Sequence, residues 1–189
     1  MLYLIIIGGS MLLIIQLNVI HALPAFVEQG AWGVALCTLL GTLSVIAWDG
    51  IQALLIRRLL PRALFRPGKR MFNVPKSERA FYRRLRVNEW KDLVPELGGF
   101  SGFRKSQKCA PSDPVYLERF LLESNYGVII HLFNALLGCM ILYLPWCSSL
   151  SIGLPIALVN AVLSLLPVIV LRFNTAPLYR LYRHALQKA

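Results

Sequence analysis

Charged side chains are scarce in this sequence. They make up 15% of its 189 residues, whereas soluble domains carry about a quarter. Hydrophobic residues account for 57% of the chain, and no Lys or Arg occurs before Arg57. This balance excludes an ordinary soluble domain and indicates a small integral membrane protein.

Several sequence signatures are also missing. The chain has no Gly-x-Ser-x-Gly elbow, P-loop, Rossmann fingerprint or His-Glu-x-x-His motif, which argues against the enzyme classes that depend on them. His-x-x-x-x-Asp, the mark of soluble glycerolipid acyltransferases, is absent too, and the four cysteines form no Cys-x-x-Cys. One intramembrane His with scattered carboxylates makes no recognisable ligand set, so no metal site and no cofactor are expected.

Four apolar runs are present instead. Each is about 20 residues long, which is enough for a helix to cross a hydrocarbon core of about 30 Å. No basic residue precedes the first run and no convincing cleavage site follows it, so we interpret it as a span and not as a signal peptide. The predicted spans cover residues 2–20, 32–56, 124–146 and 152–171.

The distribution of positive charge predicts the topology. All 20 Lys and Arg lie either between the second and third spans or after the fourth, and the two connections on the other side hold none. The positive-inside rule then places the middle segment and both termini in the cytoplasm of a multi-pass plasma-membrane protein. The net charge of +11 is expected to contact anionic inner-leaflet lipid, not nucleic acid.

The predicted fold is therefore an all-α membrane protein with four transmembrane helices. Two membrane hairpins, 1–56 and 124–171, are joined by a basic cytoplasmic segment, 57–123, and followed by a basic tail, 172–189. Within the segment, apolar and basic residues at mixed helical spacing predict an amphipathic interfacial helix over 77–94. Four spans bury limited surface alone, so a homo-oligomer is a reasonable expectation.

Polar residues inside the spans are the candidates for chemistry, because each is costly in lipid. Glu123 and Asn134 lie eleven residues apart, or three helical turns, so they share a face of the third span near His131. A neutral His131, roughly 12 Å deeper than Glu123, could act as a general base toward a hydroxyl on a lipid. Asp49 and Ser164 are expected at a similar depth, where Asp49 could orient the imidazole.

Alternative interpretations remain open for these residues. His131 could simply hydrogen-bond across helices, and that is the default for Gln16, Asn18 and Asn160. Arg172 could anchor the last helix or bind a substrate phosphate through its two-pronged guanidinium.

A second set of candidates is predicted to bind substrate at the cytoplasmic side. Its members lie in the polar passage from Asn88 to Lys105 and at the end of the fourth span. They are Trp90, Lys91, Asp92, Arg104, Lys105, Arg172 and Asn174. Asn134 and Ser164, inside the third and fourth spans, are predicted to bind substrate as well.

Several ordered motifs carry a family resemblance. They are Gln16-Leu17-Asn18, Trp90-Lys91-Asp92, Pro95-Glu96-Leu97-Gly98, Gly102-Phe103-Arg104-Lys105, Glu123 with His131 eight residues on, and Arg172-Phe173-Asn174. In order and spacing they resemble the glycosyl-4,4'-diaponeurosporenoate acyltransferase family. These small bacterial membrane proteins are named for attaching a fatty acyl chain to the sugar of a glycosylated carotenoid.

The resemblance implies acyl transfer from a donor such as acyl-CoA to a hydroxyl of a glycolipid or glycosylated terpenoid. His131 would be the base, with Glu123 and Asp49 as orienting or electrostatic groups. Two other hypotheses stand beside it: a non-catalytic lipid-binding or lipid-translocating protein, and a small subunit of a larger membrane complex.

Overall fold

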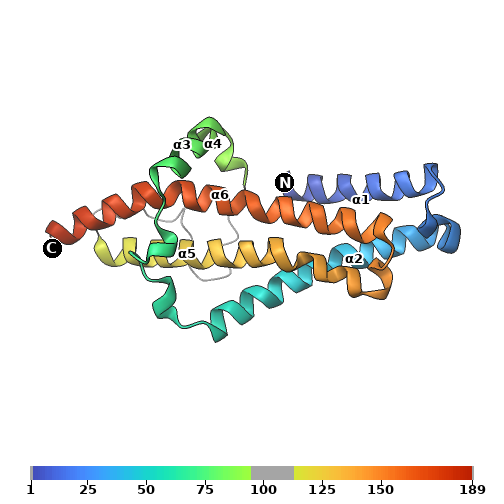
Figure 1. The fold of residues 1–189 in the computed structure, drawn as a ribbon, viewed down its shortest axis with the longest axis horizontal. Coiled ribbons are helices and arrows are strands. Elements are labelled where there is room, and N and C mark those ends of the chain that lie inside the picture. Colours follow the sequence, from blue (N-terminus) through green and yellow to red (C-terminus); the bar gives the residue numbers. More distant parts are fainter. Residues whose placement is uncertain (1, 95–112, 189) are drawn as a thin grey trace. The chain divides into compact units, whose positions relative to one another are not determined.

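The computed structural model describes residues 2–94 and 113–188, and throughout these residues the regular structure is helical. Figure 1 shows the helices in chain order. They are α1 (Leu2–Ile20), α2 (Pro24–Leu59), η1 (Arg62–Phe65), η2 (Arg70–Phe72), α3 (Lys76–Arg84), α4 (Val87–Trp90), η3 (Lys91–Leu93), α5 (Pro114–Leu137), η5 (Gly138–Tyr143), η6 (Pro145–Cys147) and α6 (Leu150–Lys188).

Within the described residues, four helical stretches are long and apolar enough to cross a membrane, and they lie where the four apolar runs predicted them. Their outward side chains are large and apolar, for example Leu4 at 70% exposed and Trp32 at 90%. Surfaces of this kind suit a lipid solvent and would aggregate in water. The four stretches indicate a multi-pass membrane protein.

The helix ends differ from the predicted spans. α5 begins at Pro114, ten residues before the predicted start, because proline suits the first turn of a helix and Asp113 Oδ1 accepts a hydrogen bond from the Val115 N–H at 2.9 Å. α6 runs on to Lys188, well beyond the apolar residues. Apolar length predicts what lipid can accommodate, whereas helix length depends on caps and packing.

The amphipathic helix predicted over 77–94 is divided in the structure. α3 ends at Arg84, and Arg86 then adopts a left-handed backbone conformation with φ 52° before α4 and η3 follow. A single residue in that conformation ends a helix. One continuous helix was therefore the wrong prediction for this stretch.

The chain forms two compact units. The first contains Met1–Leu54 and Leu132–Leu165. Within it, α1 runs beside the first half of α6 (Figure 1). Asn18, which is 1% exposed, donates to Ser151 O at 3.2 Å and accepts from Ser151 Oγ at 2.7 Å. This confirms the inter-helix hydrogen bonding predicted for Asn18.

The second unit contains Leu55–His131 and Leu166–Ala189. Within it, α5 lies beside the second half of α6 (Figure 1). A Cβ added to Gly127 on α5 would come 2.8 Å from Leu171 Cδ1 on α6. Gly127 therefore makes room for the close approach of the neighbouring helix.

Gly41 shows how tightly the first unit packs. A Cβ at this position would approach Cys147 Sγ to 2.6 Å and Ile156 Cδ1 to 2.8 Å, and both residues belong to the buried core. Gly50, on the same helix α2, has nothing within 4 Å of the equivalent position.

We expect Gly41→Ala to lower the free energy of unfolding by about 1–3 kcal/mol, because the added methyl overpacks the core. Gly50→Ala, the matched control, should be neutral or stabilise by up to about 1 kcal/mol through helix propensity. Thermal unfolding of the detergent-solubilised protein measures both. Equal melting temperatures for the two variants would contradict the packing described here.

Candidate functional site

One face of α5 in the second unit carries Glu123, Gly127 and His131 at four-residue spacing. His131 and Glu123 are half-buried. The spacing of eight residues separates the two side chains by about 12 Å along the helix, so Glu123 is out of direct reach of His131.

The Glu123 carboxylate lies against the end of α2. Arg57 Nη2 donates to Glu123 Oε2 at 2.8 Å, and the Arg57 guanidinium also lies over the Tyr126 ring, 4.9 Å from its centroid. The Tyr126 ring also stacks on Phe65, with centroids 3.8 Å apart. Glu123 therefore has a protein cation as its partner, and the group fixes where the chain leaves α2.

Arg172, at the place in α6 where the apolar run ends, is bound by Glu78 of α3. Its Nη2 donates to Glu78 Oε2 at 2.7 Å and its Nε donates to Glu78 Oε1 at 2.5 Å. The same guanidinium also donates to the carbonyl oxygens of Met71 at 3.5 Å and Asn73 at 3.3 Å. Arg172 therefore forms the expected pair of hydrogen bonds to one anionic group, and that group is the Glu78 carboxylate.

The electrostatics of α3 follow from this pair. The hydrogen bonds from Arg172 hold the pKa of Glu78 below its ordinary value, against the opposing effect of burial. Tyr82 also donates its hydroxyl proton to Glu78. Burial, and then the adjacent Glu78 carboxylate, raise the pKa of Tyr82 to about 12.

Sequence reasoning missed Glu78. The available signal was its isolation, because it is the one acidic residue between Asp49 and Glu89 in a stretch rich in Arg and Lys. A lone carboxylate among many cations is expected to pair with one of them, but nothing in the sequence says which.

The predicted cytoplasmic set is only partly described. Trp90 Nε1 donates to Leu85 O at 3.0 Å, and the Lys91 ammonium lies 5.7 Å from the centroid of Phe173, next to Arg172 on α6. Asp92 is exposed and Asn174 is half-buried. Arg104 and Lys105 lie outside the described residues, so the substrate-binding role of the whole set stays a prediction.

The first unit holds a separate polar group of its own. Asn160 Nδ2 on α6 donates to Asp49 Oδ1 at 3.3 Å and to Asn134 O at 3.4 Å. A Cβ on Gly138 would come 2.6 Å from Asn160 Nδ2, so the glycine leaves room for this amide. The structure thus brings Asp49 and Asn134 together and confirms the inter-helix hydrogen bonding predicted for Asn160. Ser164 is buried in the same unit, and the roles of these residues in catalysis or substrate binding stay predictions.

Among the residues that the structure describes, no three His, Cys, Asp or Glu side chains lie close enough together to hold a metal ion.

Comparison with protein-family models gives one match. Residues 61–184 fit CrtO, described as glycosyl-4,4'-diaponeurosporenoate acyltransferase. The chain belongs to this acyltransferase family. The matched residues include Glu78, Glu123, His131 and Arg172, whereas the Gln16-Leu17-Asn18 motif lies before them. No curated protein and no solved structure matches the chain.

The chain is thus an acyltransferase of the carotenoid glycosyl ester family in which four helical stretches are long and apolar enough to cross a membrane. The match covers most of the second unit and also the Leu132–Leu165 part of the first unit.

The Glu78–Arg172 pair predicts a specific pH dependence. A carboxylate whose folded pKa lies below its unfolded value adds stability above pH 4.5, its ordinary pKa, and this contribution is lost as the pH falls through the lower folded value. We expect Glu78→Gln to cost about 1–3 kcal/mol at pH 7. The difference from wild type should narrow as the pH is lowered from about 5 to about 3.

Thermal or denaturant unfolding in detergent across this pH range makes the measurement. Glu89→Gln is the matched control, because Glu89 pairs with Arg86 in an exposed contact on the same segment and should matter little. A Glu78→Gln variant with the pH profile of wild type would contradict the pairing.

Proposed function

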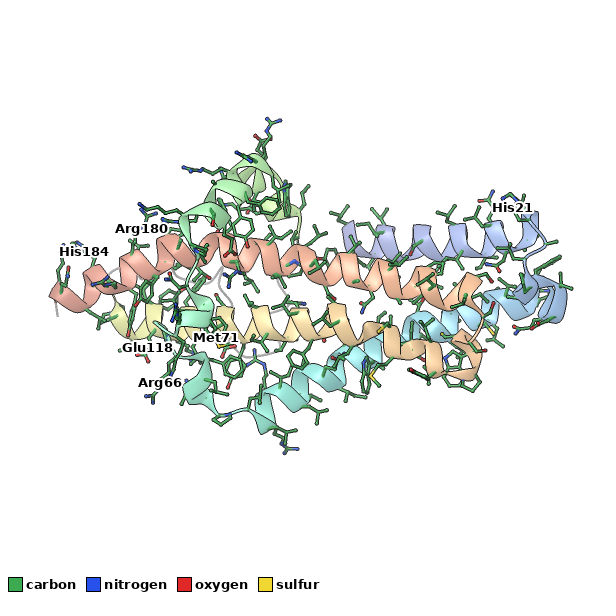
Figure 2. The ribbon with its side chains drawn as sticks, in the orientation of Figure 1. His21, Arg66, Met71, Glu118, Arg180 and His184 are labelled. Atoms are coloured by element: carbon green, nitrogen blue, oxygen red, sulfur yellow. The ribbon has the colours of Figure 1, made fainter. Side chains whose placement is uncertain are left out.

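We propose that the protein is an integral membrane enzyme that moves a fatty acyl chain to a hydroxyl of a glycolipid or glycosylated terpenoid at the inner leaflet. The observation that carries the proposal is the family match over 61–184, which contains the one histidine found deep within an apolar span, His131. The other histidines, His21 and His184, are exposed and lie near helix ends (Figure 2).

The reaction requires a base for the acceptor hydroxyl. The hydroxyl oxygen forms a bond to the acyl carbonyl carbon while its proton passes to the neutral imidazole of His131. The bond from the acyl carbon to the donor then breaks, and for a thioester donor such as acyl-CoA the sulfur leaves and takes a proton back from the imidazolium. No metal or redox partner is needed for the atoms and charges to balance.

Glu123 and Arg57 support this step as an electrostatic pair in our proposal. Their mutual salt bridge, 2.8 Å long, fixes the Glu123 carboxylate on the α5 face that also carries His131. Asp49 is proposed as a further orienting group, on the evidence of sequence alone.

The orientation is part of the proposal. With both termini in the cytoplasm, the basic segment 57–123 faces anionic inner-leaflet lipid and a soluble acyl donor. The acceptor would reach the reaction from within the same leaflet.

The test is acyl transfer by the purified protein in lipid nanodiscs, with radiolabelled acyl-CoA and a glycolipid acceptor. We expect His131→Ala to lower kcat by about 10²- to 10⁴-fold, the usual contribution of a general base. Melting temperature and elution volume should stay near those of wild type.

His21→Ala and His184→Ala are the matched controls, and both should retain wild-type turnover. Unchanged turnover in His131→Ala would refute the proposed base. Movement of a lipid headgroup across the bilayer without any acylated product would instead favour the lipid-translocating alternative.

A further inference from the structure

A cavity of about 430 Å³ lies within the second unit, a volume in the range of small-molecule sites. Its walls come from the stretch 67–74, from α3, from the first half of α5 and from the C-terminal part of α6. We call it the basic pocket after four of the residues that line it, Lys69, Arg70, Arg79 and Arg180, which it holds together with polar residues such as Asn125 and Tyr179.

Four of these side chains are cations, and none of the four pairs with a carboxylate among residues 2–94 and 113–188. Arg180 projects from the C-terminal part of α6 (Figure 2). Lys69, Arg70 and Arg180 are exposed and Arg79 is half-buried. Cations gathered on one concave surface create a positive potential that attracts anions, so an anion is the ligand that this charge favours.

Two buried polar atoms in the pocket wall have no hydrogen-bond partner among the residues that the structure describes. Arg79 Nε is a donor and Asn125 Oδ1 is an acceptor. The Asn125 amide is fixed because its Nδ2 donates to Phe65 O at 2.8 Å. Unpartnered buried groups are rare in folded proteins and call for an explanation. A ligand that satisfies both must offer an acceptor to Arg79 and an N–H or O–H to Asn125.

The wall of the pocket is held in place before any ligand arrives. Gly68 has φ 88°, and a Cβ there would come 3.2 Å from the Tyr179 hydroxyl, so glycine is needed where the backbone approaches α6. The same stretch is tied to α6 by the hydrogen bonds from Arg172 to Met71 O and Asn73 O. A preorganised site loses less entropy on binding than a flexible one.

We propose that the basic pocket binds the phosphate groups of the acyl donor, with Arg79 and Arg180 contacting phosphate oxygens and Asn125 accepting a hydrogen bond from an adjacent amide or hydroxyl of the donor. The assignment rests on the proposed acyl transfer. Coenzyme A combines phosphates with hydroxyl and amide groups in one molecule, and arginine recognises phosphate through two parallel hydrogen bonds. A phospholipid headgroup also carries phosphate, so the test must separate the two sources.

The experiment measures binding of coenzyme A to the full-length protein in nanodiscs of neutral phosphatidylcholine, by isothermal titration calorimetry. We expect Arg79→Gln and Arg180→Gln each to weaken binding by about tenfold to a hundredfold, the usual effect of losing a hydrogen bond to a charged group. The matched controls are Arg83→Gln and Arg183→Gln, which remove exposed cations from the same two helices outside the pocket and should leave affinity within about twofold.

Two ligand comparisons complete the design. Pantetheine, which lacks the phosphates, should bind much more weakly than coenzyme A. Nanodiscs that contain anionic phosphatidylglycerol should compete only weakly. Equal affinity for pantetheine, or binding that Arg79→Gln and Arg180→Gln leave unchanged, would overturn the proposal. Binding of anionic lipid in the pocket, with no binding of coenzyme A, would also overturn the proposal.

Failure of the pocket and failure of the proposed function give different results. If the basic pocket is correct but acyl transfer is not, coenzyme A binds with the expected dependence on Arg79 and Arg180, and no acylated product forms. If acyl transfer is correct but the pocket is not, turnover occurs and its KM for the donor does not respond to these two substitutions.

Discussion

Lipid offers no hydrogen bonds to a polar group, and this constraint explains the placement of the polar side chains in the apolar helices. Asn18 is bonded to Ser151, Trp48 Nε1 donates to Leu137 O at 3.1 Å, and Asn160 reaches Asp49. Each contact joins segments that are far apart in sequence, so the requirement for a partner also selects which helices pack together. Glycines at the crossing points allow these partners to approach.

The second unit is organised by a contact of a different kind. The Glu78–Arg172 pair joins a short helix of the connecting segment to α6, and the spare guanidinium hydrogens bind the carbonyls of the intervening stretch. The pair lies at the end of an apolar run, where the effective dielectric constant is lower than in bulk water and the attraction between the two charges is stronger. The walls of the basic pocket depend on the same bonds, since one of them is the stretch that Arg172 orders.

The sequence predicted helix positions correctly where contact with lipid is the main requirement. The run from Leu2 to Ile20 is a helix with the predicted ends. The extents of α5 and α6 were missed, since their outer turns depend on a proline, an aspartate cap and tertiary packing. The left-handed conformation of Arg86 and the choice of Glu78 as the partner of Arg172 have no local signature. The basic pocket is likewise assembled from four segments, and its cations look in sequence like any others in a stretch crowded with them.

α6 is continuous for 39 residues, which corresponds to about 58 Å at 1.5 Å per residue. A hydrocarbon core of about 30 Å accounts for only half of that length. From Leu171, where the apolar run ends, the helix rises about 14 Å to Arg180. In the binding mode proposed for the basic pocket, the charged end of a donor at Arg180 is therefore about 14 Å along the helix from the end of the apolar run, and the arm between its phosphates and its acyl carbon must be long enough to cover that distance.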